Sequence, residues 1–244
     1  MTKQAEVPKL MWTGGWDSTF RLLQRLLIEG KPIEPVYVIH PERQSAAAEI
    51  KAMKKIEQRL IARYPHVKAN FLPRSTVVFD SEPNDGYQHA HDRIVEQQYL
   101  GTQYVWMASF CRRTGIHDIE LAIHRDDKAH EILAPLVSAT NDRGSYRVDQ
   151  RFRGTDEYKL FRFFRLPIFD LTKTEMRDIA KAEGFEDLMR LTWFCHTPAR
   201  GQQPCGICNP CIYTIQEGLG DRVPWWGRVK YHFRALTLLK FRHA

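Results

Sequence analysis

The residues best suited to chemistry stand near the N-terminus, where two adjacent glycines are flanked by hydroxyl and carboxylate side chains. The segment consists of Thr13, Gly14, Gly15, Trp16, Asp17, Ser18 and Thr19. Adjacent glycines let a backbone approach a ligand closely, and the amides at the start of a helix attract anions. Thr13 and Ser18 add hydroxyl donors for phosphate oxygens, and Asp17 can hold a magnesium ion that bridges phosphates. The segment predicts a phosphate site that includes a metal ion; the alternative is a plain glycine turn leading into a helix.

A second group of chemically active residues lies near the C-terminus, where four of the five cysteines form the pattern C-x9-C-x2-C-x2-C. They are Cys195, Cys205, Cys208 and Cys211. Two-residue spacings place thiolates on one side of a tight turn, and a more distant cysteine can complete a tetrahedron around Zn²⁺. The alternative is a set of buried or redox-active thiols. His196 is an alternative ligand, and Cys111 is expected to serve only in packing.

The charge of the chain favours anionic partners. Its 244 residues carry a formal net charge of +7, which suits nucleotides, phosphates or RNA without choosing among them. No stretch is apolar for long enough to span a bilayer, and residues 1–9 are polar and contain no apolar signal region. We therefore expect a soluble protein in the cytoplasm with no membrane partner.

The elements that must position these residues alternate between strands and helices. Apolar and β-branched runs predict strands at residues 10–13, 35–40, 76–79 and 118–123. Helical spacing predicts helices at residues 19–29, 45–64, 101–113 and 172–184, the last opened by a capping box between Thr172 and Glu175. This order implies an α/β fold, in which helices cover both faces of a parallel sheet and ligands bind beyond the carboxyl ends of its strands.

The rest of the chain divides into less regular parts. Residues 146–165 are rich in arginine and aromatic side chains and are expected to be extended. The segment from residue 225 to the end is basic and aromatic. We expect two domains: an ATP-binding α/β domain at residues 1–190, and a C-terminal module at residues 191–244 that contains the four cysteines and the basic-aromatic tail.

The N-terminal string resembles the SGGxDS loop of the PP-loop ATP pyrophosphatases, with Thr13 replacing the usual serine. The chain contains neither GxxxxGK[ST] nor GxGxxG after a strand, so it is not expected to be a P-loop NTPase or a dinucleotide-binding protein. Together with the cysteine pattern, the loop resembles the 7-cyano-7-deazaguanine synthase (QueC) family. That resemblance extends from about Leu10 to Cys211 and implies the adenine nucleotide alpha hydrolase-like fold.

The resemblance also implies a function. Members of the family use ATP to adenylate 7-carboxy-7-deazaguanine, and ammonia displaces AMP to give an amide and then the nitrile of queuosine biosynthesis. The implied cofactors are ATP, Mg²⁺ and Zn²⁺, and family members often form homodimers. Lys173 falls on a family lysine and is expected to stabilise transition-state charge, while Asp17 is expected to hold magnesium. Asp126 and Asp127 fall where the family carries polar residues that face the substrate.

Three alternatives remain at this point. A QueC-like enzyme of an antiviral system would attach a deazaguanine to a protein. A PP-loop enzyme that modifies tRNA would use the basic aromatic segments at residues 151–165 and 225–242 to contact RNA. A nucleotide-binding module without catalytic activity would keep the loop and bind ATP without producing AMP.

Overall fold

The computed structural model describes residues 7–79, 86–141 and 144–240, and for residues 234–240 it describes the backbone alone. The first six residues of the polar N-terminal segment and the last four of the basic-aromatic tail lie outside this description. Within it, no helix is both long and apolar enough to cross a bilayer.

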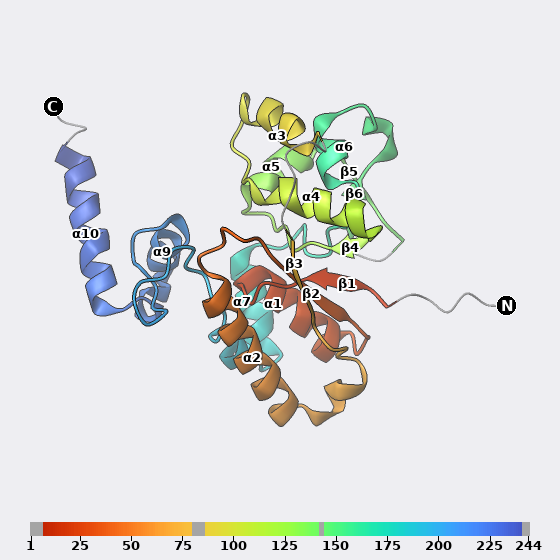
Figure 1. The fold of residues 1–244 in the computed structure, drawn as a ribbon. Coiled ribbons are helices and arrows are strands. Elements are labelled where there is room, and N and C mark those ends of the chain that lie inside the picture. Colours follow the sequence, from red (N-terminus) through yellow and green to blue (C-terminus); the bar gives the residue numbers. More distant parts are fainter. Residues whose placement is uncertain (1–6, 80–85, 142–143, 241–244) are drawn as a thin grey trace.

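A parallel sheet forms the centre of the fold, as the alternation of strands and helices predicts (Figure 1). Its five strands follow the order β3-β2-β1-β4-β7, and every neighbouring pair is parallel. The strands are β1 (Lys9–Met11), β2 (Glu34–Ile39), β3 (Ser75–Val78), β4 (Ile119–Glu120) and β7 (Phe164–Arg165). A separate antiparallel pair consists of β5 (Val137–Ala139) and β6 (Tyr146–Val148).

Helices connect these strands. The α-helices are α1 (Trp16–Leu23), α2 (Ala46–Arg63), α3 (Tyr87–Val95), α4 (Gln103–Thr114), α5 (Lys128–Leu133), α6 (Asp156–Phe161), α7 (Lys173–Ala182), α8 (Glu186–Met189), α9 (Asn209–Thr214) and α10 (Trp225–Lys240). The 3-10 and π-helical segments are η1 (Gln24–Ile28), η2 (Pro65–Ala69), η4 (Gln150–Phe152), η5 (Ile215–Leu219) and η6 (Gly220–Arg222). The predicted helices at residues 45–64 and 101–113 correspond to α2 and α4. The predicted helix at residues 19–29 begins three residues earlier, at Trp16.

The two faces of the sheet are buried in two separate apolar clusters. Leu10 and Tyr37 belong to a cluster with α1, α2, α7 and α8, whereas Met11, Val36 and Val38 belong to one with α3, α4 and α6. Alternate residues of a strand point to opposite faces, so the nearly continuous apolar runs of β1 and β2 supply both clusters. In Figure 1 the two sets of helices lie on opposite sides of the sheet.

The segment at residues 146–165 is only partly extended, so this expectation was wrong for its central part. Thr155 accepts a hydrogen bond from the amide of Tyr158 at 3.2 Å and thereby caps α6. Phe161 ends this helix, and Phe163 and Phe164 follow it, all three side chains being buried. These aromatic side chains therefore pack in the core. Aromatic residues can pack there from a helix as well as from a strand, so their presence did not decide between the two.

A buried ion pair fixes α1 to the sheet. The guanidinium of Arg21 donates two hydrogen bonds to the carboxylate of Glu120 in β4, from Nε at 2.7 Å and from Nη2 at 2.8 Å. Both side chains are almost fully buried. Arg21 also forms an ion pair with Glu29 through Nη1, so the buried guanidinium has two acidic partners, and Glu120 is the more deeply buried of them.

We expect Glu120→Ala to lower the free energy of unfolding by about 2–3 kcal/mol, because the buried Arg21 loses two charge-assisted hydrogen bonds while its ion pair with Glu29 remains. Urea denaturation followed by circular dichroism measures the change. The matched control is Asp187→Ala, which breaks an exposed ion pair with Arg63 and should have a much smaller effect. Equal losses of stability in the two variants would contradict the role assigned to the buried pair.

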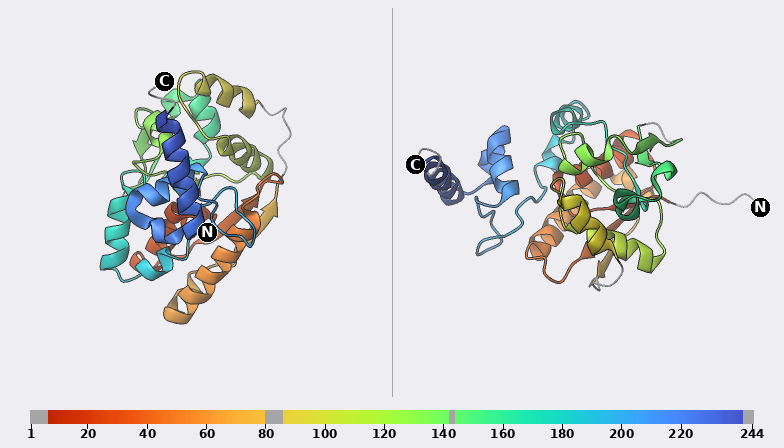
Figure 2. Two further views of the ribbon diagram at one scale, coloured as in Figure 1. Left: turned by 90° about the vertical axis from the view of Figure 1, so that its left-hand side faces the viewer. Right: turned by 90° about the horizontal axis from the view of Figure 1, so that it is seen from above.

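The C-terminal module stands beside the sheet rather than within it. Figures 1 and 2 show α9 next to the sheet domain and α10 on the far side of the cysteine segment. Gly206 has a φ of +81°, and a side chain there would overlap the backbone of Gly227 in α10. The first turns of α10 therefore pack closely on the cysteine loop.

Candidate functional site

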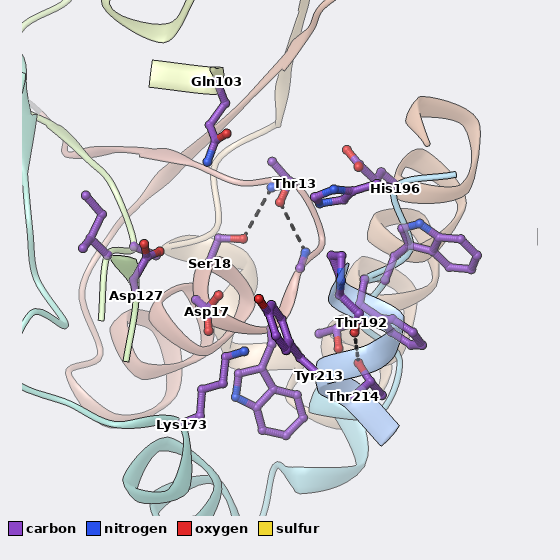
Figure 3. A pocket seen from close by; sticks show the side chains of 18 of the residues that line it. Thr13, Asp17, Ser18, Gln103, Asp127, Lys173, Thr192, His196, Tyr213 and Thr214 are labelled. Atoms are coloured by element: carbon purple, nitrogen blue, oxygen red, sulfur yellow. Dashed lines mark hydrogen bonds between the residues drawn. The ribbon is translucent and has the colours of Figure 1, made fainter. Parts of the chain in front are cut away.

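A cavity of about 490 Å³ opens beyond the carboxyl ends of β1 and β4 (Figure 3). In the strand order, β2 and β3 lie on one side of this pair and β7 lies on the other. The connections therefore diverge between β1 and β4, which is where ligands bind in open α/β sheets. The glycine loop, the segment after β4, the start of α7 and the C-terminal module all contribute to its lining.

The glycine loop turns sharply between β1 and α1. Gly14 adopts a φ of +70°, and a Cβ there would lie 2.9 Å from Cγ of Met53. Gly15 is the N-cap of α1, and no side chain forms a capping hydrogen bond at this end of the helix. The first amides of a helix have no partner within the helix, so those of α1 can donate to a ligand.

The hydroxyl groups of the loop divide between the cavity and the core. Thr13 and Ser18 line the cavity together with Gly15, Trp16 and Asp17. Thr13 Oγ1 accepts a hydrogen bond from the Gly15 amide at 3.4 Å, and Ser18 Oγ lies 3.5 Å from the Thr13 amide. Thr19 instead accepts a hydrogen bond from the indole of Trp12 at 3.0 Å and is fully buried. Thr19 therefore anchors the helix and does not line the cavity.

Asp17 has a carboxylate oxygen that lies close to His124. Its Oδ1 is buried without a hydrogen-bond partner among the described residues. His124 Nε2 lies 3.5 Å from this oxygen, and His124 Nδ1 accepts a hydrogen bond from the Asp126 amide at 3.1 Å. Because Nδ1 is an acceptor, the proton of neutral His124 resides on Nε2 and faces Asp17. The arrangement orients the Asp17 carboxylate and leaves it available to a cation.

Lys173 begins α7 and lies between two acidic groups. Burial lowers its pKa, but the negative charges of Asp17 and Glu217 outweigh burial and raise the pKa above its ordinary value. Its Nζ lies 3.3 Å from Oε1 of Glu217 in η5. Lys173 is therefore a permanent cation in the cavity at neutral pH. The predicted capping box that starts α7 is present, with Thr172 and Glu175 bonded reciprocally.

The two aspartates after β4 have different places. Asp127 lines the cavity, caps α5 by accepting from the Ala129 amide at 2.8 Å, and has its pKa raised mainly by burial. Asp126 does not line the cavity. It accepts a hydrogen bond from the Lys173 amide at 2.9 Å, which fixes the start of α7.

The C-terminal module contributes one wall of the cavity. Tyr213, Glu217 and Arg222 all line it, and the amide of Trp193 donates a hydrogen bond to the carbonyl of Gly14 at 2.8 Å. This bond joins the module directly to the glycine loop. Figure 3 shows Tyr213 of the module lining the same cavity as Asp17 and Lys173. A ligand in the cavity would therefore touch both parts of the chain.

A polar network lies at another part of the lining. Glu49 is buried and accepts hydrogen bonds from Tyr37 at 2.8 Å, from Ser45 at 2.6 Å and from Arg43 at 3.0 Å. Arg43 and Glu49 line the cavity with Trp106 and the residues around it. The network therefore supplies polar groups in fixed positions, and Trp106 supplies a flat aromatic surface beside them.

The four predicted cysteines form a candidate metal centre. The sulfur atoms of Cys195, Cys205, Cys208 and Cys211 lie within 4.8 Å of one another. The amides of Ile207 and Cys208 donate to the sulfur of Cys205 at 3.5 and 3.4 Å, which favours a thiolate. Four cysteines this close together can hold one metal ion.

The remaining thiol and the neighbouring histidine lie outside this group. Cys111 is buried in α4, where burial raises its pKa to about 12, so it is a packing residue as expected. His196 lines the cavity and is not one of the four clustered ligands.

Several lining residues were not found by sequence reasoning. They are Arg43, Glu49, Gln103, Tyr213 and Arg222. His124, which does not line the cavity but lies behind Asp17, was not assigned a role either. His124 stands directly after the predicted strand at residues 118–123, so its position was the available signal. Arg222 lies eleven residues beyond the last cysteine and belongs to no motif.

Comparison with protein-family models finds no family that matches the chain, and comparison with curated proteins finds no match either.

Proposed function

We propose that the chain is an ATP-dependent adenylating enzyme similar to 7-cyano-7-deazaguanine synthase, built on a PP-loop variant of the α/β fold. The observation that carries the proposal is the convergence of the glycine loop, Asp17 and Lys173 on one cavity at the point where the sheet connections diverge. Such a site can bind a phosphate chain, hold a metal ion and neutralise developing negative charge.

The lining fits ATP with magnesium. Open amides at the start of α1 and the hydroxyls of Thr13 and Ser18 are suitable donors for phosphate oxygens. The unsatisfied Oδ1 of Asp17 is a suitable ligand for a hard cation. A magnesium ion held by Asp17 would supply positive charge that stabilises the phosphate oxygens.

The four-cysteine cluster fits zinc. Four thiolates complete a tetrahedral coordination sphere, so the ion would leave no position for a catalytic water and its role would be structural. The ion would hold the cysteine loop to the start of α9. The residues that follow in the chain, among them Tyr213 and Glu217, line the cavity.

In the proposed first stage, a carboxylate oxygen of 7-carboxy-7-deazaguanine attacks the α-phosphorus of ATP. The bond from that phosphorus to the β-phosphate oxygen breaks, and pyrophosphate leaves. Lys173 stabilises the negative charge that develops on the phosphate oxygens, and its raised pKa keeps it protonated. Ammonia then attacks the acyl carbon, and AMP leaves with the electron pair of the carbon–oxygen bond. The products are an amide, AMP and a proton.

In the second stage, the amide oxygen attacks a second ATP and releases pyrophosphate. Loss of AMP and of the nitrogen protons gives the nitrile. The same residues serve both stages, because each stage places an oxygen nucleophile beside an α-phosphate held on the glycine loop. AMP and pyrophosphate are therefore the products common to both.

A second candidate keeps the adenylation and changes the acceptor to a macromolecule, either a protein or tRNA. The observation that favours it is α10, where the side chain of Trp225 is 71% exposed and Arg228 and Lys230 are also exposed. An exposed basic and aromatic helix on the module that lines the cavity suits a large anionic partner.

Mass spectrometry of the purified protein with ATP, magnesium, ammonia and 7-carboxy-7-deazaguanine tests the proposal. AMP together with the amide or nitrile is the expected result. AMP that forms only after addition of a protein or tRNA acceptor would favour the second candidate. Bound ATP with no AMP under any of these conditions would contradict both, and would indicate a nucleotide-binding module without catalytic activity.

A further inference from the structure

Arg222 is held firmly at the wall of the cavity. It ends η6, downstream of the cysteine cluster, and lines the cavity. Its Nη2 donates to the carbonyl oxygen of Thr192 and, at 3.0 Å, to Oγ1 of the same residue. Its Cζ lies 4.9 Å from the centre of the Phe194 ring. These contacts fix the guanidinium by one nitrogen and one face.

The charge of Arg222 has no ion-pair partner within the described part of the chain. The two acidic side chains that act on it most strongly are already engaged, since Asp221 pairs with Arg190 and Glu217 pairs with Lys173. Burial and the nearby Arg190 lower the pKa of Arg222 to about 10. A partly buried cation without an acidic partner is unfavourable, and an anion in the cavity would compensate for it.

Arg222 is also close to the glycine loop. The peptide group between Thr192 and Trp193 accepts a hydrogen bond from Arg222 through its carbonyl and donates one to the Gly14 carbonyl through its amide. A single peptide unit therefore separates the guanidinium from the loop. The guanidinium and the loop line the same cavity, so one ligand can contact both.

We propose that Arg222 binds the β- and γ-phosphates of ATP, so that the C-terminal module completes the site on which pyrophosphate forms. The proposal rests on the proposed function, because it assumes that the α-phosphate lies at the glycine loop. A guanidinium presents a planar fork of donors that matches phosphate oxygens and carries a permanent charge. Lys173 and Arg222 would then neutralise the leaving pyrophosphate from two sides of the cavity.

Isothermal titration calorimetry of the zinc-loaded full chain tests this role with magnesium and three probes, namely ATP, AMP and inorganic pyrophosphate. Arg222→Gln should weaken the binding of ATP and pyrophosphate by about 10- to 100-fold, because it removes charge-assisted hydrogen bonds. AMP binding should not change, because AMP lacks the β- and γ-phosphates. Arg222→Lys retains the charge without the fork and should give a smaller loss.

The matched control is Arg200→Gln, which removes one exposed positive charge from the same module and should leave all three affinities unchanged. Zinc content and the thermal unfolding midpoint establish that each variant is folded. Equal weakening of ATP and AMP would overturn the proposal, because it would indicate a general disturbance of the cavity. Unchanged binding of ATP would also overturn it.

The pyrophosphate titration separates this proposal from the proposed function. If the wild-type protein bound no nucleotide, the adenylation proposal would fail. Arg222 would still be an anion-binding residue if pyrophosphate bound to wild type and not to Arg222→Gln. If pyrophosphate bound neither protein, the role of Arg222 would be refuted as well.

Discussion

Asp17→Asn should reduce AMP formation by about a thousandfold or more while leaving the fold intact, since metal and electrostatic stabilisation of a phosphoryl transition state is worth several kcal/mol. The substitution preserves the shape of the side chain and removes its charge. It therefore removes the negative charge expected to hold the metal, on a side chain whose Oδ1 is buried and accepts no hydrogen bond from the described residues. Release of AMP and pyrophosphate under saturating substrate measures the effect.

The metal dependence of Asp17→Asn identifies the cause. The magnesium concentration required for half-maximal activity should increase, and binding of Mn²⁺ in the presence of ATP should weaken. Asp187→Asn removes an exposed carboxylate on α8 and serves as the control, with activity and metal dependence expected to match wild type. Retention of wild-type AMP formation in Asp17→Asn would contradict the role assigned to this residue.

Removal of the metal from the four-cysteine cluster should abolish both ATP binding and AMP formation while the parallel sheet remains folded. Three of the four cysteines form their own small buried cluster with Trp193 and Phe194, separate from the two clusters of the sheet domain. A segment with so small a buried cluster needs its metal ion to stay folded, because zinc binding to such sites contributes about 10–16 kcal/mol of free energy at neutral pH. Loss of order there would displace the wall that contains Glu217 and Arg222.

Cys205→Ser and treatment with a strong chelator are the two ways to make this change. Elemental analysis should find about one zinc ion per chain in wild type, in keeping with a single four-thiolate site, and much less in the variant. Hydrogen exchange should increase at residues 195–222 and remain low in β1 and β2. Cys111→Ala is the control and should retain zinc, because that thiol lies in α4. Full ATP binding by the zinc-free protein would show that the module does not contribute to the nucleotide site.

The elements that depend on local patterns could be predicted from the sequence. The alternation of short apolar runs with helical spacing predicted a parallel sheet, because parallel strands need helical connections that cover both faces. Thr172 and Glu175 predicted the start of α7, since a capping box involves only residues three apart. The cysteine spacing predicted four clustered sulfurs for a similar reason. Residues 146–165 were misjudged because aromatic side chains pack into a core from helices and strands alike.

The site, in contrast, required the tertiary structure, because contacts between distant segments leave no pattern in a single sequence. The sequence placed Asp126 and Asp127 together after a strand, and only the fold directs Asp127 into the cavity and Asp126 to the first amide of α7. His124 faces Asp17 because the carboxyl ends of β1 and β4 are neighbours in the sheet. Arg222 reaches the cavity because the Trp193 amide bonds to Gly14 and brings the C-terminal module against the glycine loop. The sequence alone determined which chemical groups are present, and the packing of the module on the loop decided which of them share one cavity.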